Sequence, residues 1–228
     1  MQFNGFSFEG IKFLKKLENN NTKVWFENNR TTWEKYILLP NTNFVQEMGE
    51  TLQILVPTIH FKSKVSGSLF RIYRDVRFSK DKTPMKNKIG VMFWQGQAHR
   101  MQSSCFYIQY NKENYLVASG IRSFKPPLLK AYRKYIKHKK HRESLHVILE
   151  DLKAKGYSIT EPKYKRVPAE FDKNEEYVYL TKYASMFVFI EYKLDDIFFT
   201  PQIVDKVFKL YQDMFKLQQW VYKMSLSV

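Results

Sequence analysis

The spacing of the apolar residues changes twice along this chain, and that change constrains the fold more than any other feature. Ile11, Leu14 and Leu17 repeat at helical spacing, and Ser7 can cap a helix that begins at Phe8. From about residue 68 the apolar side chains alternate, and helical spacing returns in the C-terminal part. We therefore predict an α+β fold: a single domain with an antiparallel-rich central sheet and flanking helices at both chain ends.

The first part of the chain, residues 1–59, is predicted to be helical. After the first helix, a second one is expected from Thr22 to Leu39, with an aromatic face that includes Trp25 and Phe26. Pro40 should stop this helix, and it also suits the first position of a third one.

Residues 60–125 are predicted to be rich in strands. Ser68 to Phe78 reads as a strand in which Arg74 falls on the apolar side, so that the strand bulges there or Arg74 is buried with a partner. Two further strands, 102–110 and 115–119, flank Asn111–Asn114 and indicate a β-hairpin.

Residues 126–228 are predicted to hold helices with one or two further strands. Pro126 begins a helix, another helix ends at Gly156, and Pro201 begins the last one. Phe187 to Tyr192 reads as a strand. No linker separates these three parts, so we expect one domain over residues 1–228.

Several classes of protein are disfavoured by composition. The longest apolar run, Met186 to Ile190, is far too short to span a bilayer, and no signal peptide is visible at the N-terminus. The single cysteine, Cys105, excludes an internal disulfide and a zinc site of several cysteines. We expect a cytoplasmic protein without a membrane partner.

The positive charge is concentrated in two segments. The chain has 38 basic and 22 acidic residues, which gives a net charge of +16. Residues 60–90 hold nine basic and two acidic side chains, and residues 122–142 hold nine basic and none that is acidic. Local excess of this kind is typical of an anion-binding surface.

The first basic segment contains the densest group of candidate site residues. Three of the nine arginines fall within seven positions of one another, and arginine supplies the forked donors that suit phosphate or carboxylate. The candidates for anion binding in this segment are Arg71, Arg74, Arg77, Lys82 and Lys86. Asp75 and Asp81 lie among them and are the candidates for catalysis.

This segment resembles the hallmark of the family catalogued as domain of unknown function family 2461. The family pattern Arg-x-x-Arg-Asp-x-Arg-Phe-Ser-x-Asp-Lys-x-Pro-Tyr-Lys matches residues 71–86 except at Met85, where the family has tyrosine. Other parts that resemble the family are Phe13-Leu14, Asn19-Asn20, Trp25-Phe26, Arg133, Lys165-Arg166-Val167-Pro168 and Phe171-Asp172, whereas its glycine-rich turn is reduced here to Gly120. The resemblance implies an intracellular single-domain protein and no known activity. It makes the basic residues Arg133, Lys165 and Arg166 further candidates for anion binding.

Three functions are compatible with these residues. The leading hypothesis is a module that binds a phosphorylated or otherwise anionic ligand, with a phosphorylated small molecule or nucleic acid as partner. The alternative is a metal-assisted phosphodiester hydrolase or nuclease in which Asp75 and Asp81 converge. The third is a non-catalytic interaction protein whose arginines and aspartates form a structural ion-pair network. In each case Asp75, beside three arginines, should have a depressed pKa.

The remaining candidate residues are interpreted as core or surface residues. The basic residues of 122–142 are interleaved with aromatic ones, as in nucleic-acid binders, but Tyr132 and Tyr135 lie on the apolar stripe of their helix and are expected in the core. His138 and His141 are interpreted as surface residues and Cys105 as a small core residue. No metal site is predicted, and the sequence leaves the identity of any cofactor unknown.

Overall fold

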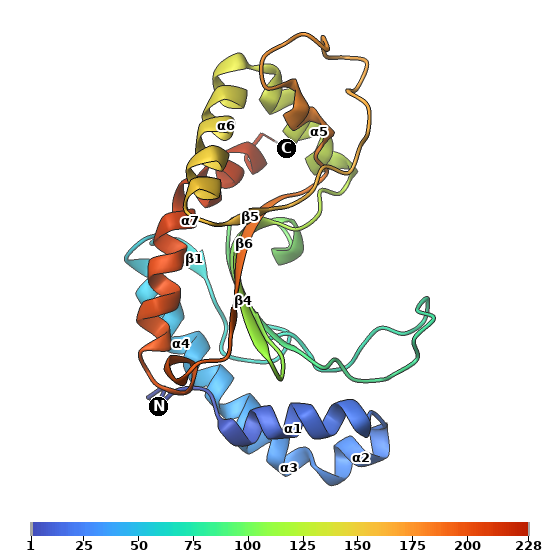
Figure 1. Ribbon diagram of the computed structural model, residues 1–228, viewed down its shortest axis with the longest axis vertical. Coiled ribbons are helices and arrows are strands. Elements are labelled where there is room, and N and C mark those ends of the chain that lie inside the picture. The colour runs from blue at the N-terminus through green and yellow to red at the C-terminus, as the bar shows by residue number, and fades with distance from the viewer. Residues whose placement is uncertain (1, 228) are drawn as a thin grey trace. The chain divides into compact units, whose positions relative to one another are not determined.

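The computed structural model describes residues 2–227 and contains one sheet, with helices near both ends of the sequence (Figure 1). The helices are α1 (Phe8–Asn19), α2 (Lys23–Asn28), α3 (Arg30–Trp33), α4 (Leu39–Gln53), α5 (Pro126–Lys137), α6 (Lys139–Ala154) and α7 (Ile203–Ser225). The strands are β1 (Ile59–His60), β2 (Ile89–Gln95), β3 (Ser104–Tyr110), β4 (Asn114–Ile121), β5 (Ser158–Ile159) and β6 (Met186–Lys193). The predicted α+β class is confirmed.

The strands of residues 2–227 form one antiparallel sheet in the order β1-β2-β3-β4-β6-β5. The predicted hairpin is β3 and β4, and its turn is held by Asn111, whose Oδ1 accepts hydrogen bonds from the backbone N–H groups of Glu113 and Asn114 at 2.7 and 2.8 Å. At the other end of the order, Ser158 of β5 pairs with Phe189 of β6. None of the helices of residues 2–227 is both long and apolar enough to cross a bilayer.

The chain packs as two compact units, which are described separately below. The first unit comprises the described residues up to Phe93, with Tyr107–Val117 and Glu191–Lys209. The second comprises Trp94–Phe106, Ala118–Ile190 and the described residues from Leu210 onward. The division passes through strands of the sheet and through α7.

The first helix of the first unit begins as predicted, whereas the predicted second helix is interrupted. Ser7 caps α1, since its Oγ accepts a hydrogen bond from the N–H of Gly10 at 3.3 Å. The predicted helix from Thr22 to Leu39 is wrong in its extent, because α2 ends at Asn28 and Asn29 caps it with a side chain that donates to the carbonyl of Trp25.

Pro40 also behaves differently from the prediction, because it does not stop the helix. A π-helical turn over Glu34–Leu38 leads directly into α4, and Pro40 lies in the first turn of that helix. Proline has no N–H to donate, and the wider π-helical turn accommodates its ring. Asn41 Nδ2 donates to the carbonyl of Ile37 at 2.7 Å, so that this carbonyl keeps a partner.

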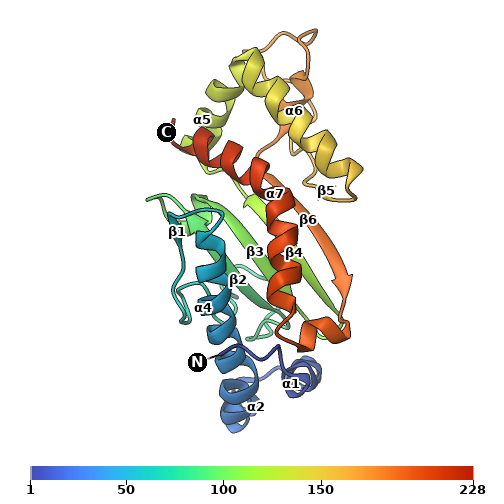
Figure 2. The same ribbon diagram turned by 90° about the vertical axis from the view of Figure 1, so that its left-hand side faces the viewer.

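Aromatic side chains make up the core of the first unit. Phe6 packs against Phe44, Tyr110 and Phe198, with ring centroids 5.1, 5.0 and 4.6 Å away. Figure 2 shows α4 running across the strands, and Phe44 of α4 meets Phe93 of β2 at 6.4 Å. Edge-to-face and offset pairs of this kind add to the burial of apolar area.

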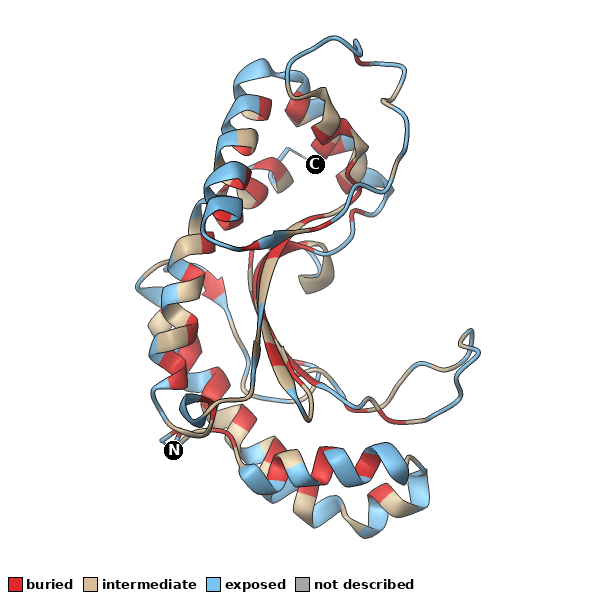
Figure 3. Ribbon diagram, in the orientation of Figure 1, coloured by how far each residue is buried: buried red, intermediate tan, exposed pale blue. Residues whose placement is uncertain are grey.

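The core of the second unit lies where α5, α6 and the end of α7 bury their apolar faces (Figure 3). Tyr211 of α7 packs on Phe106 of β3 with ring centroids 4.7 Å apart. Tyr132 of α5 is fully buried, as predicted, and its hydroxyl donates to the carbonyl of Leu180 at 2.8 Å. Gly156, with φ of +88°, follows α6 as predicted for a residue beyond a helix C-terminus.

One predicted strand is absent, and the long strand β2 was not predicted. Residues 71–88 form a long loop instead of the strand predicted over Ser68 to Phe78. The alternation there does not follow burial, because Ile72 is buried whereas Phe78, on the same side of the predicted strand, is 96% exposed. The strand that the sheet uses is β2, in which nearly every side chain is buried, so that its sequence shows no alternation.

Arg142 holds the end of α5 against the loop that precedes β6. It is 4% exposed, and its Nη1 donates to the carbonyls of Ile136 and Lys137 at 3.0 and 3.3 Å. Its Nε donates to the carbonyl of Glu176, and its Nη2 lies 2.6 Å from Glu175 Oε2. The C-terminal carbonyls of a helix have no partner within the helix. The guanidinium of Arg142 donates to two of these carbonyls at the end of α5.

The close approach of β4 to β6 requires glycine at position 120. Gly120 has φ of +125°, and a Cβ there would lie 2.1 Å from the carbonyl oxygen of Met186. At Gly156 a Cβ would meet nothing within 4 Å, although φ is also positive. We expect Gly156→Ala to cost about 1 to 2 kcal/mol, the penalty of the left-handed conformation alone. Gly120→Ala should cost clearly more, because the strands must also separate. Urea unfolding of both variants measures the difference, and equal costs would contradict it.

Replacing Arg142 should destabilise the second unit even by a residue that keeps the charge. We expect Arg142→Lys to lower the free energy of unfolding by about 2 to 4 kcal/mol, because one ammonium cannot reach all four acceptors. Exposed Lys140, on the same helix, provides the control, and Lys140→Arg should change stability by less than about 0.5 kcal/mol. Urea unfolding followed by circular dichroism measures both, and a neutral Arg142→Lys would contradict the assigned role.

Candidate anion-binding sites

The motif loop, residues 71–88, is a hairpin-like excursion attached to the N-terminal helices of the first unit. Tyr73 forms a bridge with Met85, and the N–H of Arg74 donates to the carbonyl of Pro84 at 2.8 Å. Asn21 clamps Met85 from the turn after α1, because its Nδ2 donates to the Met85 carbonyl and its Oδ1 accepts from the Met85 N–H, at 3.0 and 2.9 Å. The hydroxyl of Tyr73 donates to Glu27 of α2 at 3.0 Å.

Arg74 closes the far part of the motif loop. Its Nη1 donates to Asp81 Oδ2 and to the hydroxyl of Thr83, and its Nη2 lies 3.4 Å from Ser79 Oγ. Asp81 Oδ1 also accepts the backbone N–H of Thr83 at 2.9 Å. Because of these bonds, the pKa of Asp81 falls from its usual 3.8 to about 2, through the Thr83 N–H first and Arg74 second.

Asp75 is engaged separately, by Arg77. Arg77 Nε and Nη2 donate to the two carboxylate oxygens of Asp75 at 2.9 and 2.7 Å, which is the forked arrangement that suits guanidinium and carboxylate. This contact lowers the pKa of Asp75 from 3.8 to about 2. The depressed pKa that the sequence predicts for Asp75 is therefore present, with Arg77 as its main cause.

The lysines of the motif loop donate to its backbone. Lys82 Nζ donates to the carbonyl of Val76 at 3.0 Å, and Lys86 Nζ donates to that of Arg71 at 2.7 Å. Arg71 itself is exposed, and among residues 2–227 its guanidinium has no assigned hydrogen-bond partner. Of the predicted anion-binding residues in this loop, Arg74, Arg77, Lys82 and Lys86 thus have acceptors within it.

A second basic site, here called the basic hollow, lies on α5 in the second unit. Its volume is about 550 Å³. Its charged lining residues are Lys130, Arg133, Lys134, Lys137, Lys163 and Glu170. The four residues from α5 share one face of that helix, since they follow one another at spacings of three, one and three. Five cations against one carboxylate make the basic hollow strongly positive.

Arg133 is the most constrained side chain of the basic hollow. Its guanidinium lies over the ring of Tyr164 at 5.3 Å, and its Nη1 is 3.7 Å from Glu170 Oε1. Its Nε is buried and, among the described residues, has no hydrogen-bond acceptor. A buried N–H without an acceptor costs roughly 1 to 3 kcal/mol, so that an anion which supplied an oxygen there would bind favourably.

Two predicted residues stand outside the basic hollow, and three unpredicted ones line it. Lys165 and Arg166 are exposed and are not part of its lining. Lys163, Tyr164 and Glu170 were not expected to face Arg133. They come from the segment that follows β5, and the N–H of Tyr164 donates to the carbonyl of Lys182 at 2.9 Å. Nothing local in the sequence indicates this long-range approach.

None of the remaining candidates lines the basic hollow. Within residues 2–227, no three or more His, Cys, Asp and Glu side chains gather closely enough to hold a metal ion. The rings of His138 and His141 lie 5.3 Å apart, and His141 stacks on Tyr135 at 3.8 Å. Cys105 is buried, and burial raises the pKa of its thiol to about 12. The catalytic role predicted for Asp75 and Asp81 stays a prediction.

Comparison with known proteins places the chain in one family. The family model described as conserved hypothetical protein (DUF2461) matches residues 9–220, which covers most of the chain. No curated protein matches. The chain belongs to the DUF2461 family, as its motif loop predicted.

The two carboxylates of the motif loop should titrate independently. We expect Arg74→Gln to raise the pKa of Asp81 from about 2 toward 3.8, and Arg77→Gln to raise that of Asp75 while leaving Asp81 unchanged. In the wild type, the stability from both pairs is present above about pH 4 and is lost as the pH falls through about 2, since both folded pKa values are depressed. Carbon-13 NMR titration of the aspartate carboxyls measures each pKa. A shift of both in either variant would contradict the separate pairing.

Proposed function

We propose, for this member of the DUF2461 family, that it binds the phosphate group of a small phosphorylated ligand in the basic hollow on α5. The buried Nε of Arg133 is the observation that carries the proposal. A phosphate oxygen would accept from this N–H, and the surrounding lysines would neutralise the remaining charge.

The geometry of Arg133 supports a recognition role. The cation–π contact with Tyr164 restrains the guanidinium, so that less freedom is lost when it meets an acceptor. The contact to Glu170 at 3.7 Å is long for a hydrogen bond and leaves donor capacity for a second acceptor. Lys130, Lys134 and Lys137 are exposed on the same helix face and extend the positive field toward solvent.

The motif loop is a weaker candidate for the same role. Arg74 and Arg77 already hold carboxylates, and Lys82 and Lys86 hold backbone carbonyls. A ligand phosphate would have to break these contacts before it could bind. We therefore propose that the motif loop is structural, with Arg71 as the residue that remains available at its base.

The proposal predicts that Arg133 contributes to binding and not to stability. We expect Arg133→Met to leave the melting temperature of the ligand-free protein unchanged or higher, because it removes a buried donor that has no acceptor. The same variant should lose the rise in melting temperature that inorganic pyrophosphate produces in the wild type. Arg122→Met, at an exposed arginine of the same basic segment outside the hollow, is the control and should keep that rise.

Two outcomes would count against this proposal. A large fall in the melting temperature of ligand-free Arg133→Met would indicate a structural arginine. The second outcome is that pyrophosphate has no effect but single-stranded oligonucleotides bind. If their affinity falls steeply with salt and is equal in Arg133→Met and Arg122→Met, the basic segment 122–142 is a general nucleic-acid surface. Repeating the titration at low and high salt separates these results.

A further inference from the structure

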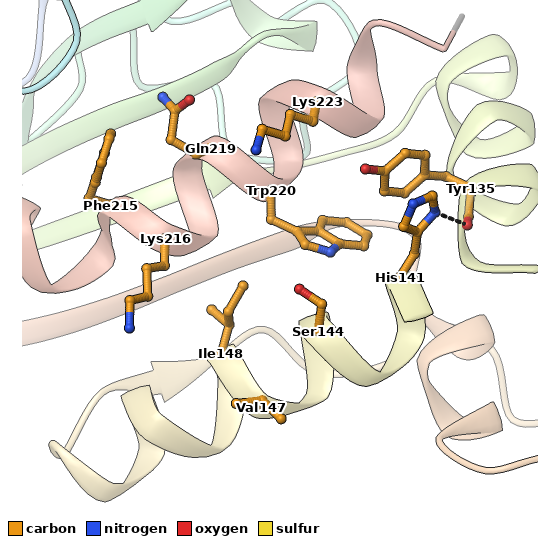
Figure 4. Close-up of a pocket in the computed structure, with 10 residues that line it drawn as sticks. All are labelled: Tyr135, His141, Ser144, Val147, Ile148, Phe215, Lys216, Gln219, Trp220 and Lys223. Atoms are coloured by element: carbon orange, nitrogen blue, oxygen red, sulfur yellow. Dashed lines mark hydrogen bonds between the residues drawn. The ribbon is translucent and has the colours of Figure 1, made fainter. Parts of the chain in front are cut away.

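A groove between α6 and the end of α7 forms a second, chemically different hollow in the second unit (Figure 4). Its volume is about 720 Å³, within the range of small-molecule sites. Trp220 and Phe215 from α7 and Val147 and Ile148 from α6 supply its apolar surface. Val147 is 60% exposed, so that part of this apolar surface is open to solvent.

Polar hydrogens converge on this apolar groove. Figure 4 shows the indole nitrogen of Trp220 on the side of the ring that faces Ser144, whose hydroxyl points toward it. Among the described residues, neither Trp220 Nε1 nor Ser144 Oγ has a hydrogen-bond partner assigned. Both are available to a group in the groove, and the indole N–H can only donate.

His141 and Tyr135 form the rigid end of the groove. His141 Nδ1 lies 2.8 Å from the carbonyl oxygen of Tyr135, and the two rings stack at 3.8 Å with an angle of 10° between their planes. Tyr135 also meets Trp220 edge to face at 5.2 Å. These contacts hold the aromatic wall in place, so that the groove is preformed.

The charge of the groove has one sign. Lys216 and Lys223 project from α7 beside it, and no acidic residue lines it within the described part of the chain. An apolar groove with two donors and two lysines complements a ligand that has an apolar body and one anionic group. A strongly hydrated polyphosphate would leave most of this apolar surface without a partner.

We infer that the groove between α6 and α7 binds a small amphiphilic carboxylate. The carboxylate oxygens accept hydrogen bonds from Ser144 Oγ and Trp220 Nε1, in the field of Lys216 and Lys223. The apolar body lies along Ile148 and Phe215 and covers Val147. This site shares no lining residue with the basic hollow, so that it stands or falls independently of the proposed function.

Calorimetric titration of the full chain with decanoate, below its micelle concentration, tests the inference. Decanoate should bind at one site, and decanol, which has the same chain length without the charge, should bind at least about tenfold more weakly. Equal affinities would overturn the recognition of the anionic group. Failure of decanoate to bind would overturn the inference. Binding of an acidic amphipathic peptide without binding of decanoate would overturn it too, because that result assigns the groove to a helix of a partner protein.

Matched variants locate the binding. Val147→Asp places a carboxylate at the edge of the groove and should weaken decanoate binding at least about tenfold through like-charge repulsion. Val24→Asp makes the same change at the exposed Val24 of α2 and should leave the affinity unchanged. Ser144→Ala, which removes one donor at an exposed position, should weaken binding about threefold to tenfold. Wild-type affinity in both Val147→Asp and Ser144→Ala would place decanoate elsewhere and overturn the inference.

Discussion

Guanidinium groups that leave bulk water must find acceptors, and the arginines of this chain differ in how far the fold meets that requirement. Arg142 is almost fully buried and has four acceptors, three of them backbone carbonyls. Arg74 and Arg77 are paired with carboxylates of their own loop. Arg133 makes a cation–π contact with Tyr164 and is partly buried, yet its Nε has no acceptor among the described residues. The same chemistry therefore supports the helix packing of the second unit, closes the motif loop and leaves the Nε of Arg133 without an acceptor in the described part of the chain.

Helix α5 presents three different faces, in place of the two faces of an ordinary amphipathic helix. Leu128, Tyr132 and Ile136 face the core, while Arg133 and the lysines beside it face the basic hollow. Tyr135 lies on neither face and forms a wall of the groove instead. Successive residues of a helix are rotated by about 100° around its axis. Side chains of α5 can therefore point into the core, the basic hollow and the groove. The helix can hold so much charge because its apolar face is fully buried.

Local features of the sequence were predicted well, because they depend on neighbouring residues. The cap at Ser7, the hairpin turn at Asn111 and the glycine after α6 each follow from chemistry within a few positions. Strand β2 escaped prediction because burial on both faces removes the alternation that marks a strand. Residues 71–78 of the motif loop were predicted to be a strand because their apolar residues alternate, but only Ile72 of them is buried and Phe78 is 96% exposed. The basic hollow was predicted only in part, since Tyr164 reaches Arg133 through long-range packing.

The motif of residues 71–86 is the most recognisable part of the sequence, but it indicates a ligand site less strongly than the residues of the basic hollow, which come from separate segments. Donors and acceptors that lie within one short loop satisfy one another as the loop closes, as Arg74 and Asp81 do. Residues brought together from distant segments, such as Arg133 and Tyr164, are positioned by the packing of their helix and loop, which does not oblige every donor to be paired. An unpaired charged donor at the surface of a preformed hollow costs stability, and a ligand anion offsets that cost on binding. Dense arginine motifs should accordingly be judged by the acceptors they already hold.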